Sequence, residues 1–169
     1  MGIKLSAVTG GDNEVGKRFG RPTFKRDLDP KAITGNIRGT ITVANYTFNQ
    51  PGLREIIGPR IAIVHELAHA WDQRTGGFWA WLTNGPGTIT AGMPSAIGNE
   101  DAPTGYGDSN ILEDWAESVA SYVYPEYAEI LVAENPPRVQ AGIQPGLDTR
   151  PNHYNYVACQ FGISTSCNP

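Results

Sequence analysis

The sequence predicts a single α+β domain in which a small sheet packs on one helix and a second helix lies opposite it. Three stretches of the chain predict this fold: a β-branched and aromatic stretch from Asn36 to Phe48, and apolar stripes of helical spacing from Ile61 to Trp71 and from Leu112 to Val123. At 169 residues, of which 40% are hydrophobic, the chain can bury one core but is short for two domains. We therefore expect residues 1–169 to form one domain.

The first part of the chain is expected to contribute one strand. Residues 1–30 are rich in Gly, Lys, Arg, Asp and Pro without a steady period, which predicts an irregular lead-in. In the next stretch Thr alternates with Ile and Val, as is typical of a half-buried strand, and a turn is expected near Asn45. We expect this strand, Ile37 to Phe48, to lie at the edge of the sheet, where an extended peptide substrate can add as a further strand.

The first helix is expected to begin at Pro59, because proline is tolerated in a first helical turn. Its buried stripe recurs at intervals of three, four and three residues, at Ile61, Val64, Ala68 and Trp71. The helix should end at Gly76, since glycine commonly follows the last helical turn.

The stretch from Gly76 to Gly107 shows no sustained period, and we expect a long loop there. Its aromatic residues Phe78, Trp79 and Trp81 have two open interpretations. They contact substrate side chains, as residues in loops on a rigid scaffold often do, or they cover the core beneath the loop.

The second helix should stop at Pro125, and a short third helix is expected from Tyr127 to Glu134. Beyond it, residues 138–169 are expected to form an irregular C-terminal tail. This tail contains both cysteines of the chain, Cys159 and Cys167, at a spacing that allows a disulfide to close a small loop. A disulfide predicts a secreted or extracellular protein, whereas two reduced thiols are the alternative.

Charge and hydropathy exclude two classes of partner. The net charge is −4 and no cluster of Lys and Arg is present, so we expect no nucleic-acid binding. Apolar stretches are far shorter than the ~20 residues that cross a bilayer, so we expect no membrane span. The expected state is a monomer.

The most informative motif is His65-Glu66-Leu67-Ala68-His69, which fits H-E-x-x-H in the middle of the first helix. Residues four apart lie on one helix face about one turn apart, so both imidazoles can bind one Zn²⁺ ion. Glu66 can then act as the general base that takes a proton from water beside the metal. The pattern is typical of metallopeptidases, and a hydrogen-bonded surface pair of histidines is the alternative.

A catalytic zinc site of this kind needs a third protein ligand. The second helix offers Glu113 and Glu117, four residues apart and therefore on one face. Either carboxylate can complete a site of two histidines and one glutamate. Alternatively, Glu113 is a capping partner of Asn110, and Glu117 is a solvated helix residue.

Together these motifs resemble a known family. His65 to Asp72 reads H-E-L-A-H-A-W-D, and Tyr106 to Ser118 reads Y-G-D-S-N-I-L-E-D-W-A-E-S. They are similar to the gluzincin metallopeptidases of the anthrax lethal factor type, which include the bacterial Pro-Pro endopeptidases. The resemblance covers Ile61 to Val123 and implies a zincin-like fold with one catalytic zinc ion.

The resemblance also implies roles for individual residues. It assigns zinc ligation to His65, His69 and Glu113, general base catalysis to Glu66, oxyanion stabilisation to Tyr106, and support of the ligands to Glu117 and Asp72. The chain departs from the family at Ala68, where many relatives have Gly. We expect no counterpart of the toxin's additional substrate-recognition domains within these 169 residues, so substrate preference does not transfer.

The sequence therefore predicts a zinc-dependent endopeptidase that acts on a protein or peptide substrate. Two alternatives remain: an aspartate-zincin in which Asp101, shortly before Tyr106-Gly107, is the third ligand, and a non-catalytic binding module with a structural metal. A structural zinc normally has four Cys or His ligands, and the remaining histidine, His153, is isolated and expected on the surface.

Overall fold

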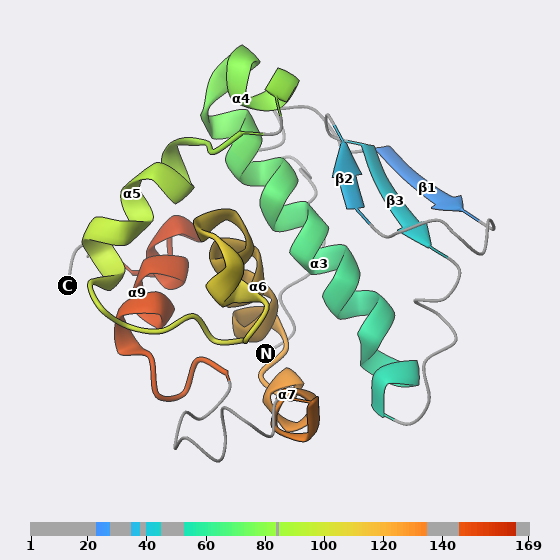
Figure 1. Cartoon of the computed structure of the whole chain (residues 1–169), viewed down its shortest axis with the longest axis vertical. Coiled ribbons are helices and arrows are strands. Elements are labelled where there is room, and N and C mark those ends of the chain that lie inside the picture. Colours follow the sequence, from blue (N-terminus) through green and yellow to red (C-terminus); the bar gives the residue numbers. More distant parts are fainter. Residues whose placement is uncertain are drawn as a thin grey trace.

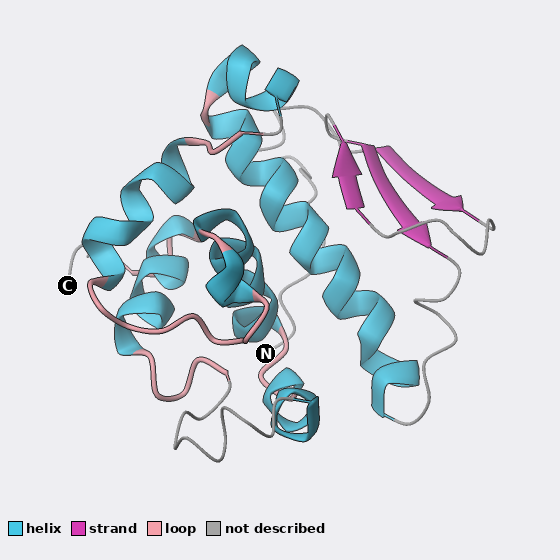
Figure 2. Cartoon of the chain, in the orientation of Figure 1, coloured by secondary structure: helices cyan, strands magenta, loops and turns pink. Residues whose placement is uncertain are grey.

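The structure is a computed structural model that describes residues 23–27, 35–37, 40–44, 53–83, 85–134 and 146–164. Its longest helix, α3 (Leu53–Thr75), runs through the middle of the molecule, with a sheet on one side and the other helices mainly on the opposite side (Figure 1). Figure 2 shows the same separation by element type. None of the described helices combines the length and the apolar character that a membrane crossing requires.

The described strands form a three-stranded sheet in the order β1-β3-β2. Strand β3 (Thr40–Ala44) is parallel to β1 (Thr23–Asp27) and antiparallel to β2 (Gly35–Ile37). The predicted single strand is therefore two strands, and its main part, β3, is central, so the predicted edge position is wrong. The prediction of an irregular lead-in over residues 1–30 is also wrong, because β1 lies within this stretch. Asn45, where a turn was predicted, lies outside the described residues.

One face of the sheet packs against α3. Ile41 and Val43 alternate along β3 and bury their side chains against Leu67 and Ile63 of the helix. Leu67 lies midway between His65 and His69, on the opposite side of the helix at about 100° per residue. The two imidazoles therefore point away from the sheet and towards the helical layer.

Helix α3 begins at Leu53, so the prediction that Pro59 starts the helix is wrong. Proline removes one backbone hydrogen bond within a helix, but this loss does not fix where the helix begins. The C-terminal end at Thr75, just before Gly76, is confirmed.

The main core lies between α3 and three further helices: α5 (Thr88–Ile97), α6 (Ile111–Val123) and α9 (Pro151–Gln160). Its buried residues include Val64, Ala68, Ile89, Met93, Trp115, Ala116, Val119, Tyr156 and Val157. Trp115 is fully buried, and its indole Nε1 donates a hydrogen bond to the Ala68 carbonyl at 3.0 Å. This contact fixes α6 against the part of α3 that carries the two histidines.

The prediction of a long loop from Gly76 to Gly107 is wrong, because this stretch contains two helices, α4 (Gly77–Thr83) and α5. Helix α5 buries Ile89, Met93 and Ala96 at helical spacing. Its interior Gly92 and Pro94 are residues that normally disfavour helices, and they hide this period in the sequence. Tertiary burial overrides the unfavourable local propensity.

The C-terminal region also differs from its prediction. The prediction of helix α7 (Tyr127–Glu134) is confirmed. The prediction of an irregular tail over residues 138–169 is wrong, because this stretch contains helix α9. Pro151 in the first turn of α9 was a signal for this helix. Cys159, in the last turn of α9, is buried and disulfide-bonded, whereas Cys167 lies outside the described residues.

Candidate metal centre

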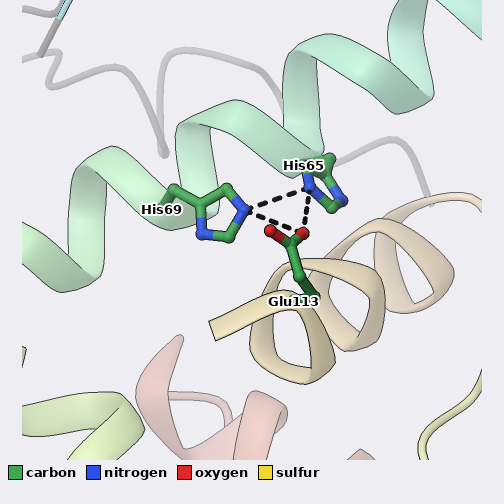
Figure 3. A group of neighbouring side chains, drawn as sticks. All are labelled: His65, His69 and Glu113. Carbon is green, nitrogen blue, oxygen red and sulfur yellow. Dashed lines mark hydrogen bonds and ion pairs between the residues drawn. The ribbon is translucent and has the colours of Figure 1, made fainter. Parts of the chain in front are cut away.

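Three side chains from two helices converge on one point (Figure 3). His65 Nε2 lies 3.1 Å from His69 Nε2 and 3.0 Å from Glu113 Oε2, and His69 Nε2 lies 3.2 Å from the same Glu113 oxygen. The two histidines come from successive turns of α3, and Glu113 comes from the first turn of α6. Among the described residues, these three form the group of His, Cys, Asp and Glu side chains that can hold a metal ion.

The local sequence explains how Glu113 reaches the histidines. Asn110 caps α6, and its side-chain oxygen accepts hydrogen bonds from the backbone amides of Leu112 (3.0 Å) and Glu113 (3.1 Å). The Glu113 carboxylate does not return to Asn110 as in a capping box, but turns to the imidazoles. The capping alternative therefore accounts for the backbone of Glu113 and not for its side chain.

The donor set fits a zinc ion. Ligand atoms placed about 2.0–2.1 Å from a tetrahedral zinc lie about 3.3 Å from one another. The three atoms here are 3.0–3.2 Å apart, so only a slight separation is needed to accept the ion. Two imidazole nitrogens and one carboxylate oxygen are also the donors of catalytic rather than structural zinc.

Glu117 orients His65 from behind. His65 Nδ1 donates a hydrogen bond to Glu117 Oε1 at 2.7 Å, so the other ring nitrogen, Nε2, faces the convergence point. Glu117 is 4% exposed, and the hydroxyl of Tyr127 donates to its second oxygen at 3.3 Å. The alternative that Glu117 is a solvated helix residue is therefore wrong.

The charges of the site depend on one another. Burial lowers the pKa of His65, but hydrogen bonds to Glu113 and Glu117 and the negative charges of Glu117 and Glu66 outweigh this effect and raise the pKa to about 10. Burial raises the pKa of Glu113, but hydrogen bonds from His65 and His69 hold it well below its usual range. The surrounding carboxylates thus favour a positive charge at the point where the three side chains converge.

Glu66 and Tyr106 lie beside this group. Glu66 is buried next to His65, is not one of the three converging side chains, and contributes negative charge that affects both His65 and Tyr106. The Tyr106 ring centroid lies 5.9 Å from that of His65, and the side chain is 60% exposed. Partial burial raises the pKa of Tyr106, as do the negative charges of Glu113, Glu66 and Glu117 and a hydrogen bond to Glu113.

Asp72 does not have the role expected from the resemblance. Its buried carboxylate accepts hydrogen bonds from the Gly87 amide (2.7 Å), the Thr90 amide (2.9 Å) and the Thr90 hydroxyl (2.6 Å). These groups belong to the start of α5, so Asp72 fixes that helix to the end of α3 and does not orient an imidazole. A carboxylate one turn beyond a metal motif can serve either purpose, and the sequence does not distinguish them.

The remaining predicted residues lie elsewhere. Asp101 is exposed and is not part of the converging group, so the structure does not bring it to the position that the aspartate-zincin alternative requires. Phe78, Trp79 and Trp81 lie on α4, but their side chains are outside what the structure describes. Their contact with substrate therefore stays a prediction.

The prediction that His153 is an isolated surface residue is wrong. Its side chain is 0% exposed, with Nδ1 2.8 Å from Glu100 Oε2 and Nε2 3.1 Å from Asp114 Oδ1. Neither carboxylate is near His153 in the sequence, so only the tertiary fold reveals the cluster.

Comparison with known proteins adds no assignment: no family model, no curated protein and no solved structure matches this chain.

Proposed function

We propose that this chain is a zinc-dependent endopeptidase with a zincin-like domain of the gluzincin type, and that His65, His69 and Glu113 hold the zinc ion. The observation that carries the proposal is the convergence of His65 Nε2, His69 Nε2 and Glu113 Oε2 within 3.0–3.2 Å of one another, with the separate carboxylate of Glu66 buried alongside. The substrates are proteins or peptides.

A zinc ion held by these side chains supplies Lewis acidity, which lowers the pKa of a water molecule to about 7 and polarises a peptide carbonyl. Glu66 acts as the general base: its carboxylate accepts the proton of the attacking water and later donates it to the leaving amine. Because Glu66 is not a ligand in this scheme, replacing it removes the base and leaves the three ligands in place.

Tyr106 stabilises the negative charge that develops on the carbonyl oxygen. Burial and the nearby carboxylates raise the pKa of Tyr106, so its hydroxyl stays protonated at neutral pH and can donate a hydrogen bond. One such donor is typically worth about 3–4 kcal/mol of transition-state stabilisation. The exposed position of the ring leaves the side of the site next to Tyr106 accessible to a peptide.

The disulfide at Cys159 supports a further part of the proposal, namely that the protein acts in an oxidising compartment as a secreted or extracellular enzyme. We propose that it acts as a monomer, since both ligand-bearing helices belong to one chain.

The test compares wild type with Glu66→Gln. Zinc content is measured by elemental analysis, and hydrolysis of denatured casein is measured with and without a chelator. Wild type should contain one zinc per chain, lose activity with the chelator and regain it when zinc is added. Glu66→Gln should keep the zinc and lose turnover by about 100-fold or more, because the base and not a ligand is removed.

Glu126→Gln is the matched control, since Glu126 is an exposed glutamate between α6 and α7. It should retain wild-type zinc content and activity. Near-full activity of Glu66→Gln would overturn the mechanism. A wild-type protein that binds zinc stoichiometrically but cleaves no protein or peptide would instead be a binding module.

A further inference from the structure

The segment that carries Tyr106 is held at both ends by one buried side chain. This segment, here called the tyrosine loop, runs from Glu100, after α5, to Asp114 in the first turn of α6. The His153 ring lies between these two residues, 2.8 Å from a Glu100 oxygen and 3.1 Å from an Asp114 oxygen. The His153 side chain is 0% exposed, the Asp114 side chain 10% and the Glu100 side chain 18%, so the Asp114 contact is well shielded from water and the Glu100 contact partly so.

The backbone of α9 strengthens the Glu100 end of this contact. The Glu100 carboxylate also accepts hydrogen bonds from the amides of Asn152 and His153, both at 3.0 Å. These amides lie in the first turn of α9, where backbone N–H groups have no partner within the helix. A carboxylate there is favoured by both the free donors and the helix dipole. Glu100 is thus fixed by three bonds to one helix start.

The Asp114 end connects directly to the metal centre, because Asp114 follows Glu113 in α6. Ser118, one turn later, donates a hydrogen bond to the same Asp114 oxygen that faces His153, at 3.3 Å. Asp114 is 7% exposed. The contact therefore fixes the Asp114 end of the tyrosine loop to α9, whereas Glu113 itself is placed by the Asn110 cap and by its contacts with the two imidazoles.

The chain before α9 binds the tyrosine loop at a second place. Arg150 is 4% exposed, and its Nε donates to the Asp101 carbonyl at 2.7 Å, while the Gly146 amide donates to the Pro103 carbonyl at 2.8 Å. The loop is also folded closely on itself: a Cβ at Gly107 would lie 2.9 Å from the Ala102 Cβ. The loop is therefore bonded to α9 and to the chain just before it on both sides of Tyr106.

We propose that His153 is a positioning residue for the peptidase reaction: by bridging Glu100 and Asp114 it closes the tyrosine loop and fixes Tyr106 beside His65. The expected effect on kcat rests on the proposed function. The closure of the tyrosine loop by His153 does not depend on catalysis. Helix α9 thereby serves the site from a distance and contributes no atom to it. In Figure 1, α9 and α6 lie next to each other, and the loop that follows α5 runs past α9 before it reaches α6.

The first test is a double-mutant cycle with His153→Gln and Tyr106→Phe. Glutamine carries its N–H donors on one nitrogen and an acceptor oxygen on the other side of the amide, so it cannot replace both imidazole nitrogens, and the bridge between Glu100 and Asp114 opens. His153→Gln should lower kcat about 10-fold with unchanged zinc content, and Tyr106→Phe about 100-fold. The double variant should match Tyr106→Phe alone, since His153 acts through Tyr106. Multiplied losses of about 1,000-fold would overturn the proposal.

The second test needs no activity. In wild type the Gly107 amide is bonded to Thr104 Oγ1 and the Ser109 amide to the Tyr106 carbonyl. Hydrogen exchange over residues 101–110 should accelerate about 10-fold or more in His153→Gln, because local opening of the loop breaks these bonds. Unchanged exchange would overturn the proposal. If no variant, including wild type, cleaves peptides, the proposed function fails while this result still decides the role of His153.

Two further variants separate positioning from general stability. Tyr156→Phe, also in α9, removes a buried hydrogen bond from the Tyr156 hydroxyl to the Ile89 carbonyl (2.6 Å), so it should lower Tm without changing kcat or exchange in the loop. Glu100→Gln keeps the side-chain size and weakens the bridge from its other end. If His153→Gln does not fold, Glu100→Gln should give the same non-additive loss with Tyr106→Phe, and wild-type kcat in Glu100→Gln would overturn the proposal.

Discussion

Two histidines of this chain, His65 and His153, have the same kind of immediate partner, but only His65 belongs, among the described residues, to a group of side chains that can hold a metal ion. Each imidazole is buried and has a carboxylate at both ring nitrogens. The shortest distances are 2.7 Å for His65–Glu117, 3.0 Å for His65–Glu113, 2.8 Å for His153–Glu100 and 3.1 Å for His153–Asp114. A histidine between two acids is therefore not by itself a sign of metal binding.

The difference lies in the other contacts of the carboxylates. The Glu113 oxygen that faces His65 also faces His69, which brings a third donor atom to the same point. Around His153 the carboxylates are occupied by hydrogen-bond donors: two backbone amides bind Glu100, and Ser118 binds Asp114. Convergence of a third donor enables the first cluster to hold a metal ion, as we propose, whereas the bonded carboxylates of the second cluster serve to connect α9 to the chain around α6.

The largest expected effect separates the two histidines. His65→Ala should lose the zinc ion and reduce peptidase activity to background, because a bound zinc requires its full set of protein ligands. His153→Gln should retain one zinc per chain. Elemental analysis after dialysis against metal-free buffer measures both. Equal zinc contents in the two variants would show that His65 and His153 do not differ in metal binding.

Glu113→Ala should lose the zinc in the same assay, and Asp101→Ala is its matched control. Asp101 is exposed and outside the converging group, so its replacement should leave zinc content unchanged. The reverse result, with zinc lost from Asp101→Ala and kept by Glu113→Ala, would establish the aspartate-zincin alternative.

A smaller effect should distinguish the carboxylates behind the two rings. Glu117→Gln weakens the bond that orients His65, and zinc affinity should fall about 10–100-fold, as is typical for groups that orient metal ligands. Glu100→Gln should leave zinc affinity unchanged, since Glu100 contacts His153 and not His65. Competition with a chromophoric chelator gives both dissociation constants. A loss of zinc affinity in Glu100→Gln as large as in Glu117→Gln would show that the second cluster also orients a metal ligand.

Asp72 extends the comparison to a third buried carboxylate near the site. Asp72→Asn leaves at least one donor of α5 without its acceptor, so the free energy of unfolding should fall by about 2–3 kcal/mol. Zinc affinity should not change. Urea denaturation measures the stability, and a weakened zinc site with normal stability would restore the role that the family resemblance implies for Asp72.

The sequence predicts the parts of the fold in which apolar residues follow a clear period. Apolar spacing predicts helix α6 and the placement of His65 and His69 on one face, whereas Gly76 and Pro125 predict where α3 and α6 end. Spacing within α6 also offers Glu113 and Glu117, but it does not say which one faces the histidines. That choice depends on how α6 packs on α3 through Trp115.

The missed elements are those whose burial is polar or whose composition opposes their structure. Helix α9 buries His153 at a position where an apolar residue would be expected. This polar position interrupts the apolar period, so the sequence pattern does not indicate a helix. Helix α5 contains Gly92 and Pro94, and its start depends on Asp72, which lies in another helix. Both helices depend on contacts with residues distant in the sequence, so the local sequence pattern does not predict them.

The smallest expected effect concerns pH. Burial lowers the pKa of His153, but hydrogen bonds to Asp114 and Glu100 and their negative charges outweigh this and raise it above 6.5. Burial raises the pKa of Glu100, but hydrogen bonds from Asn152 and His153 outweigh this and lower it below 4.5. The His153 contribution to stability is complete below pH 6.5 and is lost as pH rises through the raised pKa. The Glu100 contribution is complete above pH 4.5 and is lost as pH falls through the lowered pKa.

Both contributions are therefore present together between pH 4.5 and pH 6.5. The difference in Tm between wild type and His153→Gln should be largest in this window and should narrow by a few degrees at alkaline pH. Using the difference cancels the titration of groups that both proteins share, including those of the metal centre. Tyr156→Phe, which removes a bond between uncharged groups, should lower Tm by a similar amount at every pH below the titration of tyrosine. A constant difference between wild type and His153→Gln across this range would mean that the imidazole is held uncharged, and the contrast with His65 would then extend to protonation.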